Sequence, residues 1–237
     1  MKSHSGSLVY GGSKIAFQVQ HAQRKTLEIA VHPNGSVIVK APTDTSLDEV
    51  HQRMRKRARW VVKQLLYFQQ FQPRTPKRRY LSGETHLYMG RQYRLKVVKS
   101  EAPGVKLARG FLYVGGPERL GPKKVGEILD NWYLQRARSK FPESLDRNLR
   151  YFLRNGYEQP NLHVRKMKTR WGSLSSRGTL TLNQELIRAP RDCIDYVVTH
   201  ELCHLKHKDH SARFYRLLEQ IMPDWERRKH RLELALV

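Results

Sequence analysis

The sequence has little cysteine, no long apolar run and few acidic residues, and each shortage restricts what the chain can be. Its two cysteines are Cys193 and Cys203. If one helix carries both, they are separated by about 15 Å of rise, too far for a disulfide. We therefore expect free thiols and a reducing, cytoplasmic compartment.

Apolar residues never accumulate to the length of a membrane span, which needs about 18 in succession. The opening segment MKSHSGSLVYGG also lacks the apolar stretch of a secretory signal. Hydrophobic residues make up 39% of the 237 residues and charged residues 28%, as in globular proteins. We expect no membrane association, and either one large domain or two small ones.

Acidic residues are scarce relative to basic ones. There are 21 aspartates and glutamates against 45 lysines and arginines, so the formal net charge is +24. Such an excess attracts polyanions, which makes nucleic acid, nucleotides and acidic proteins admissible partners. A basic surface without a specific anionic partner is also compatible with this composition, because charge alone is non-specific. The sequence carries no signal of oligomeric state.

The first part of the chain predicts short strands and one long helix. Asn34-Gly35 is typical of a tight hairpin turn, and Ser46 begins a capping box. The box opens a basic, amphipathic helix that we expect to reach Phe71, followed by a basic connector at 72–79. Alternating apolar and polar residues predict the strands: Ile15–Val19, Leu27–Val31 and Val37–Val39.

Glycines and prolines between 115 and 122 interrupt the chain, and we place a soft boundary there. It separates a β-rich part at 1–118 from a second part at 119–237. In the second part, a helix should begin near Lys123, and Pro142 should end or kink it. Further strands are expected on both sides of this boundary: Leu87–Met89, Tyr93–Val98, Phe111–Val114, His163–Met167 and Leu180–Leu182.

The second part contains an H-E-x-x-H motif, from His200 to His204. Residues four apart share one face of a helix, so both imidazoles can reach a single metal ion. Glu201 lies beside them, where a base must be to deprotonate a water activated by that metal. The motif therefore predicts a zinc-dependent hydrolase with Glu201 as general base.

A catalytic zinc needs a third protein ligand and an open position for water. His210 is the first choice, because H-E-x-x-H-x-x-G-x-x-H metalloproteases place a ligand at the same spacing. His207 stands where those proteins have glycine, and it is a rival ligand. A later carboxylate, from Glu219 or Glu226, is a further alternative.

Other segments add to this motif. They are Arg170-Trp171-Gly172-Ser173, Leu182-Asn183, Asp195-Tyr196-Val197-Val198 and His210-Ser211-x-x-Phe214-Tyr215. Together with the metal motif they resemble the YgjP-like metal-dependent hydrolases, which are relatives of the SprT-like and WLM metallopeptidases. The resemblance covers about residues 24–232. In one departure, Leu174 occupies a position that is often cysteine in this family, which suggests a packing role for the leucine.

The resemblance implies an α+β, zincin-like metallopeptidase fold with a β-rich N-terminal part. It also implies zinc ligands at His200, His204 and His210, with Glu201 as the catalytic residue. Zincin-like folds have an edge strand above the metal helix, to which an extended substrate can add. We take Gly178–Asn183 as the candidate for that strand.

Three side chains are candidate substrate-binding residues: Arg170, Trp171 and Asn183. Trp171 could equally be a core aromatic residue. Arg170 could contact substrate or an oxyanion, and it could equally pair with Asp195 or Asp192. No residue is assigned as oxyanion donor; Tyr196 is on the correct helix face but fits a core position better.

The sequence leaves three functions open, of which we favour the first. It is a zinc metallopeptidase acting on polypeptide, including protein bound to nucleic acid. The second is a metal-dependent phosphohydrolase acting on nucleotides, since the same activated water suits phosphoryl transfer. The third is a nucleic-acid-binding module with a structural metal, motivated by the basic helix at Arg53–Lys63.

Overall fold

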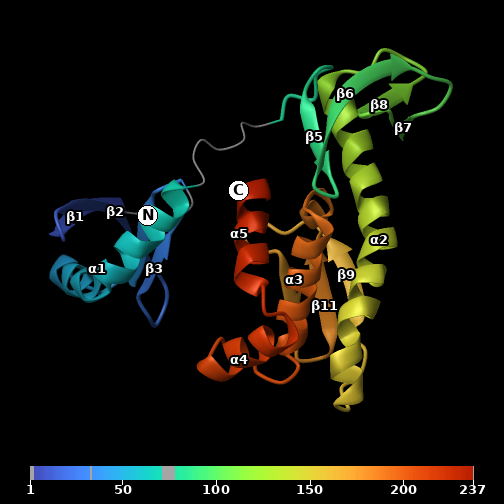
Figure 1. The fold of residues 1–237 in the computed structure, drawn as a ribbon. Helices are drawn as coiled ribbons and strands as arrows, with labels where there is room; N and C mark the ends of the chain where they lie inside the picture. The colour runs from blue at the N-terminus through green and yellow to red at the C-terminus, as the bar shows by residue number, and fades with distance from the viewer. Residues whose placement is uncertain (1–2, 33, 71–77, 237) are drawn as a thin grey trace. The chain divides into compact units, whose positions relative to one another are not determined.

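The chain folds into two compact units, each with its own hydrophobic core. The computed structural model describes residues 3–32, 34–70 and 78–236. Unit 1 is Met1–Thr75 and unit 2 is Pro76–Leu236, so the boundary expected near 118 lies inside unit 2. Across the described residues the architecture is mixed α+β, with three sheets and five α-helices (Figure 1). The predicted end of the first helix at Phe71 and most of the 72–79 connector lie outside the described residues.

Unit 1 is a four-stranded sheet covered by one helix. The strand order is β1-β2-β4-β3, with β2 and β4 parallel and the two outer pairs antiparallel. Helix α1 (Leu47–Gln69) buries one apolar stripe against this sheet, at Val50, Met54, Ala58 and Val61. The strands are β1 (Ser3–Tyr10), β2 (Ser13–Ala22), β3 (Glu28–Val31) and β4 (Val37–Pro42).

The turn predicted at Asn34-Gly35 and the helix cap predicted at Ser46 are both confirmed in unit 1. Gly35 adopts φ +81° in the β3–β4 turn, and Ser46 Oγ accepts a hydrogen bond from the N–H of Glu49 (3.2 Å). Strand β1 was not predicted, because its sequence SHSGSLVY is mostly polar. Gly6 lies opposite Phe17 in this pair, where a Cβ would come within 2.6 Å of the aromatic ring.

Unit 2 begins with a second four-stranded sheet, in the order β5-β6-β8-β7. The expected strands lie within or overlap β5, β6 and β8, whereas β7 was not predicted. Leu95, Leu112 and Val114 supply the buried residues of this sheet. Its strands are β5 (Thr85–Tyr88), β6 (Arg91–Lys99), β7 (Gly104–Ala108) and β8 (Phe111–Gly116).

Helix α2 (Pro122–Arg154) is the longest element and contacts both sheets of unit 2 (Figure 1). Of the two alternatives for Pro142, the one in which it ends the helix is wrong. Helix α2 is 33 residues long and continues past Pro142 to Arg154. Phe141 and Leu145, on either side of the proline, are buried in the core. Packing of these side chains offsets the free-energy cost of the backbone hydrogen bond that is lost at the proline.

A three-stranded sheet follows, in the order β10-β11-β9. Strand β11 (Thr179–Asn183) lies in the middle, parallel to β9 (Asn161–Arg165) and antiparallel to β10 (Gly172–Leu174). The interpretation of Gly178–Asn183 as the free edge strand is therefore wrong. The edge on that side is β10, which is too short to give an alternating pattern that sequence analysis could detect.

Three helices complete unit 2: α3 (Arg191–Cys203), α4 (Ala212–Ile221) and α5 (Trp225–Leu236). Helix α3 packs against α2, α4, α5 and β10, and its apolar residues, such as Val198 and Leu202, are fully buried. None of the described helices has the length and hydrophobicity that crossing a membrane requires.

His86 on β5 is a buried histidine away from these three helices. Its side chain is 1% exposed, and its Nε2 lies 3.4 Å from the carboxylate of Glu84. Burial lowers the pKa of His86 to about 4, and the positive charge of Arg78 acts in the same direction. The folded state therefore holds His86 neutral at pH values where an unfolded chain would protonate it.

This difference predicts a pH-dependent stability. As pH falls from the ordinary histidine value of 6.5 towards 4, the unfolded state binds a proton that the folded state does not, so the free energy of unfolding decreases. Between pH 7 and pH 5 the wild type should lose about 2 kcal/mol more than His86→Gln. Urea unfolding followed by tryptophan fluorescence at both pH values measures this difference, and parallel losses would contradict it.

Candidate active site

Helix α3 and the loop after it position three histidines. His200 lies in the last turn of α3, and His204 is the C-cap residue, with φ −69°. The chain then turns, and His210 directly precedes Ser211, the N-cap of α4. The loop thereby returns His210 towards the helix face that carries the other two imidazoles.

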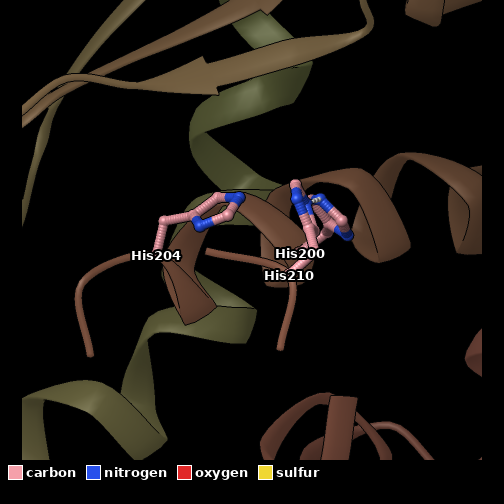
Figure 2. A group of neighbouring side chains, drawn as sticks. All are labelled: His200, His204 and His210. Carbon is pink, nitrogen blue, oxygen red and sulfur yellow. Dashed lines mark hydrogen bonds between the residues drawn. The ribbon is translucent and has the colours of Figure 1, made fainter. Parts of the chain in front are cut away.

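The three imidazoles converge, as Figure 2 shows. One ring nitrogen from each of His200, His204 and His210 lies within 4.8 Å of the other two. The Nε2 atoms of His200 and His210 are 2.9 Å apart and share a hydrogen bond. The side chain of His207, the rival ligand, is not part of this cluster in the described structure.

His207 contributes to the cluster through its backbone. The Nδ1 atom of His204 lies 2.9 Å from the carbonyl oxygen of His207, which accepts a hydrogen bond when Nδ1 carries the proton. In that tautomer the lone pair of His204 is on Nε2. A hydrogen bond of this kind commonly orients a metal-binding histidine.

Phe214 on α4 supports all three rings. It is fully buried, and its ring centroid lies 4.9 Å from that of His200, 4.7 Å from His204 and 4.8 Å from His210. The aromatic ring therefore limits how far the imidazoles can rotate away from one another. In the sequence, Phe214 is part of the segment His210-Ser211-x-x-Phe214-Tyr215, which does not by itself assign it a role at the histidines.

The electrostatics of the cluster favour neutral imidazoles. The pKa of His200 is lowered to about 3, chiefly by burial, with positive charge on His210 and His204 acting in the same direction. Burial also lowers the pKa of His210. Metal binding requires deprotonated imidazoles, and three converging neutral nitrogens are a donor set that suits zinc. The residues present therefore fit a metal ion.

Glu201 lies beside the histidines and is 8% exposed. Burial raises the pKa of its carboxyl group to about 7, while a hydrogen bond from the backbone N–H of Leu174 and the charge of Arg170 act in the opposite direction. A buried carboxyl group with such a pKa can exchange a proton near neutral pH.

Gly172 on β10 allows this carboxylate to lie against the strand. A Cβ at this position would come within 2.8 Å of Glu201 Cγ and 2.9 Å of Oε1. Position 172 therefore requires glycine, because the Glu201 side chain lies too close to the backbone of β10 to leave room for a Cβ. The neighbouring N–H of Leu174 holds the carboxylate, a backbone contact that no side-chain motif could reveal.

A cleft of about 510 Å³ opens over these residues. Arg170 and Trp171 line it, together with His200, Glu201 and Lys208. Two of the three candidate substrate-binding residues are thus brought to the site. Trp171 also packs against the core. It therefore both lines the cleft and acts as a core aromatic residue, the two interpretations that the sequence left open.

Asn183, the third candidate, does not line the cleft. It is 3% exposed, and its side-chain amide donates hydrogen bonds to the carbonyls of Met167 (2.9 Å) and Arg170 (3.1 Å). Its carbonyl oxygen accepts from the N–H of Glu185 (3.2 Å). The position of Asn183 suits it to hold the loop that carries Arg170 rather than to contact substrate.

The two pairings considered for Arg170 are both occupied by other residues. Asp195 accepts hydrogen bonds from Ser144 and from Arg147 (2.7 Å), and Asp192 pairs with Arg231 (2.8 Å). The guanidinium of Arg170 instead acts on Glu201. Cys193 and Cys203 are buried free thiols, as expected.

Comparison with known proteins places this site in a family. No match is found among curated proteins. The solved structures that match in part include two metallopeptidase zymogens. The metallopeptidase zymogen of Methanocaldococcus jannaschii jannalysin has 22% identity and a TM-score of 0.36, over 41% of this chain and 90% of that one. The metallopeptidase zymogen of Pyrococcus abyssi abylysin has 29% identity and a TM-score of 0.33, over 38% and 85%.

Both TM-scores are too low to carry an argument about fold or activity. The family match is extensive: it covers residues 25–235 and is described as a YgjP-like metallopeptidase domain. The matched range includes the three histidines, Glu201 and β10. The resemblance found in the sequence motifs is thereby confirmed, and the chain belongs to the YgjP-like family of metallopeptidase domains.

Proposed function

We propose that this protein is a zinc-dependent peptidase in which His200, His204 and His210 hold the metal and Glu201 is the general base. The observation that carries the proposal is the convergence of three imidazole nitrogens within 4.8 Å beside a buried carboxylate. Membership of a metallopeptidase family supports it. We also propose that residues 119–237 carry the chemistry in a zincin-like arrangement, in a reducing, cytoplasmic compartment.

A bound zinc ion would acidify a water molecule and polarise the scissile carbonyl group. The chain itself supplies the proton transfer. Glu201, held by the N–H of Leu174, accepts the proton of the attacking water and then donates it to the leaving amine. The carboxyl group needs no large movement between these steps, because β10 holds it on the side facing Gly172.

The substrate would bind along β10. This strand pairs with β11 on one side, and all three of its residues line the cleft. An extended polypeptide can add to such an edge through main-chain hydrogen bonds, which are independent of its sequence. Arg170 and Trp171, directly before β10, are placed to contact side chains of the substrate.

Metal content tests the ligand set. Wild-type protein purified without chelator or affinity tag should contain about one zinc per chain, and His210→Ala should contain much less, because a catalytic zinc site depends on three protein ligands. His207→Ala is the matched control. It keeps the backbone carbonyl that orients His204 and should retain its zinc.

Elemental analysis of the three proteins distinguishes the outcomes. Zinc retained in His210→Ala but lost in His207→Ala would move the third ligand to His207. No zinc in the wild type, and none taken up on addition, would overturn the proposal.

Glu201→Gln tests the general base. The amide keeps the shape of the side chain but cannot accept the proton, so cleavage of an unfolded protein should fall by about 10²- to 10⁴-fold. Zinc content should stay at the wild-type level, because Glu201 is not a proposed ligand. Cleavage at the wild-type rate in this variant would remove Glu201 from the mechanism.

Gly172→Ala tests the close approach of β10. The added methyl group should displace the Glu201 side chain and lower kcat for peptide cleavage while zinc content is unchanged. Gly104→Ala on β7 is the control, since a Cβ there meets nothing within 4 Å. Equal rates for both variants and the wild type would show that the position of Glu201 does not depend on Gly172.

A further inference from the structure

Unit 1 contains a groove that the proposed peptidase chemistry does not use. It has a volume of about 430 Å³ and lies between helix α1 and strand β3. The residues lining it are Leu27, Ile29, Arg53, Lys56, Arg57 and Trp60. Strand β3 is one of the two edge strands of its sheet, so the groove lies along an edge of the sheet of unit 1.

One face of α1 supplies most of the groove. Arg53, Lys56, Arg57 and Trp60 follow the spacing i, i+3, i+4 and i+7, which places them on the same side of the helix. The three basic side chains are exposed, and Trp60 is 41% exposed. Three cations therefore lie on the same helix face as an accessible indole ring.

The core of unit 1 does not explain this tryptophan. Helix α1 packs on the sheet through a different stripe, which includes Met54 and Ala58, and Trp60 is not part of the core cluster. Leu27, directly before β3, and Ile29 on β3 are half-buried and provide an apolar wall. An indole exposed beside an apolar wall is suited to accept a flat, weakly polar group.

The charge of unit 1 restricts the ligand. Residues 1–75 contain twelve lysines and arginines and four acidic residues. Among the described residues, no acidic side chain lines the groove. Glu28 is paired with Arg24 at 2.8 Å, and Glu49 pairs with Arg53 at 3.6 Å from outside the groove. The ligand should combine negative charge with planar rings.

We propose that this groove binds single-stranded nucleic acid, with a base stacked on Trp60 and the phosphates at Arg53, Lys56 and Arg57. Single strands expose the faces of their bases, whereas a duplex conceals them between neighbouring base pairs. An aromatic ring beside a line of cations is the usual arrangement for binding such strands without sequence preference. The inference is independent of the peptidase proposal, because no group of the metal site takes part.

Fluorescence anisotropy of the full chain with a labelled oligothymidylate of roughly 20 nucleotides tests the groove. The variant Arg53→Gln/Lys56→Gln/Arg57→Gln removes its three cations. The control Lys14→Gln/Arg55→Gln/Arg59→Gln removes three exposed cations of unit 1, one on β2 and two on other faces of α1, and none of them lines the groove. Both variants have the same net charge, so a difference between them reports position and not total charge.

The groove variant should bind at least tenfold more weakly than the control variant. In a plot of log K against log salt concentration, the slope for the groove variant should be less negative than that of the wild type by about 2. Each lost phosphate contact on a single strand contributes about 0.7 to this slope. Equal weakening in the two variants would overturn the proposal in favour of diffuse attraction by the whole basic surface.

Trp60→Leu separates stacking from charge. Leucine keeps an apolar, helix-compatible side chain without an aromatic face, and affinity should fall about tenfold, whereas Trp60→Phe should recover most of it. Circular dichroism confirms that each variant is folded. Unchanged affinity in Trp60→Leu, or equally tight and Trp60-independent binding of polyglutamate, would overturn the proposal and leave a general anion surface.

Discussion

The contact between helices α2 and α3 determines where the groups of the candidate site lie. Asp195 and Thr199 are one turn apart on α3 and face α2, where Asp195 accepts from Ser144 and Arg147, and Thr199 donates to Asn148 (3.1 Å). These bonds fix α3 in rotation and along its axis. His200 and Glu201 follow directly in sequence, so their directions are set by the same contacts. Without Ser144 and Arg147, the largely buried carboxylate of Asp195 would have no partner on α2, which would destabilise the fold.

Two separate segments then complete the site around the last turn of α3. Strand β10 brings Gly172 and the N–H of Leu174 to Glu201, while the loop after His204 brings His210 and the ring of Phe214 to the histidines. Glu201, the proposed general base, is held mainly by backbone, and the cluster of three histidines mainly by side-chain packing. A substitution can therefore disturb one without the other, which makes the proton-transfer and metal-binding roles experimentally separable.

The sequence predicted the parts of the site that follow helical periodicity or fixed spacing. His200 and His204 belong to one helix face, and the position of His210 follows from a known interval. It did not predict β10, because three residues cannot show an alternating pattern, and β11 was therefore placed at the edge. It left open whether Pro142 ends or kinks the helix, since the packing that keeps α2 continuous comes from distant parts of the chain. Asn183 was a candidate substrate-binding residue, but it lies outside the cleft, and its hydrogen bonds to loop carbonyls depend on the fold.

The overall charge is informative only when it is combined with local geometry. Unit 1 has a formal net charge of +8 and residues 76–236 one of +16, so both units would attract polyanions. An excess that is spread over the whole chain cannot identify a binding site. What distinguishes the α1–β3 groove is the exposed indole of Trp60 among three cations on one helix face, beside apolar residues of an edge strand. A diffuse field attracts any polyanion, whereas this arrangement favours one whose charges alternate with flat rings, and that property belongs to nucleic acid and not to acidic protein.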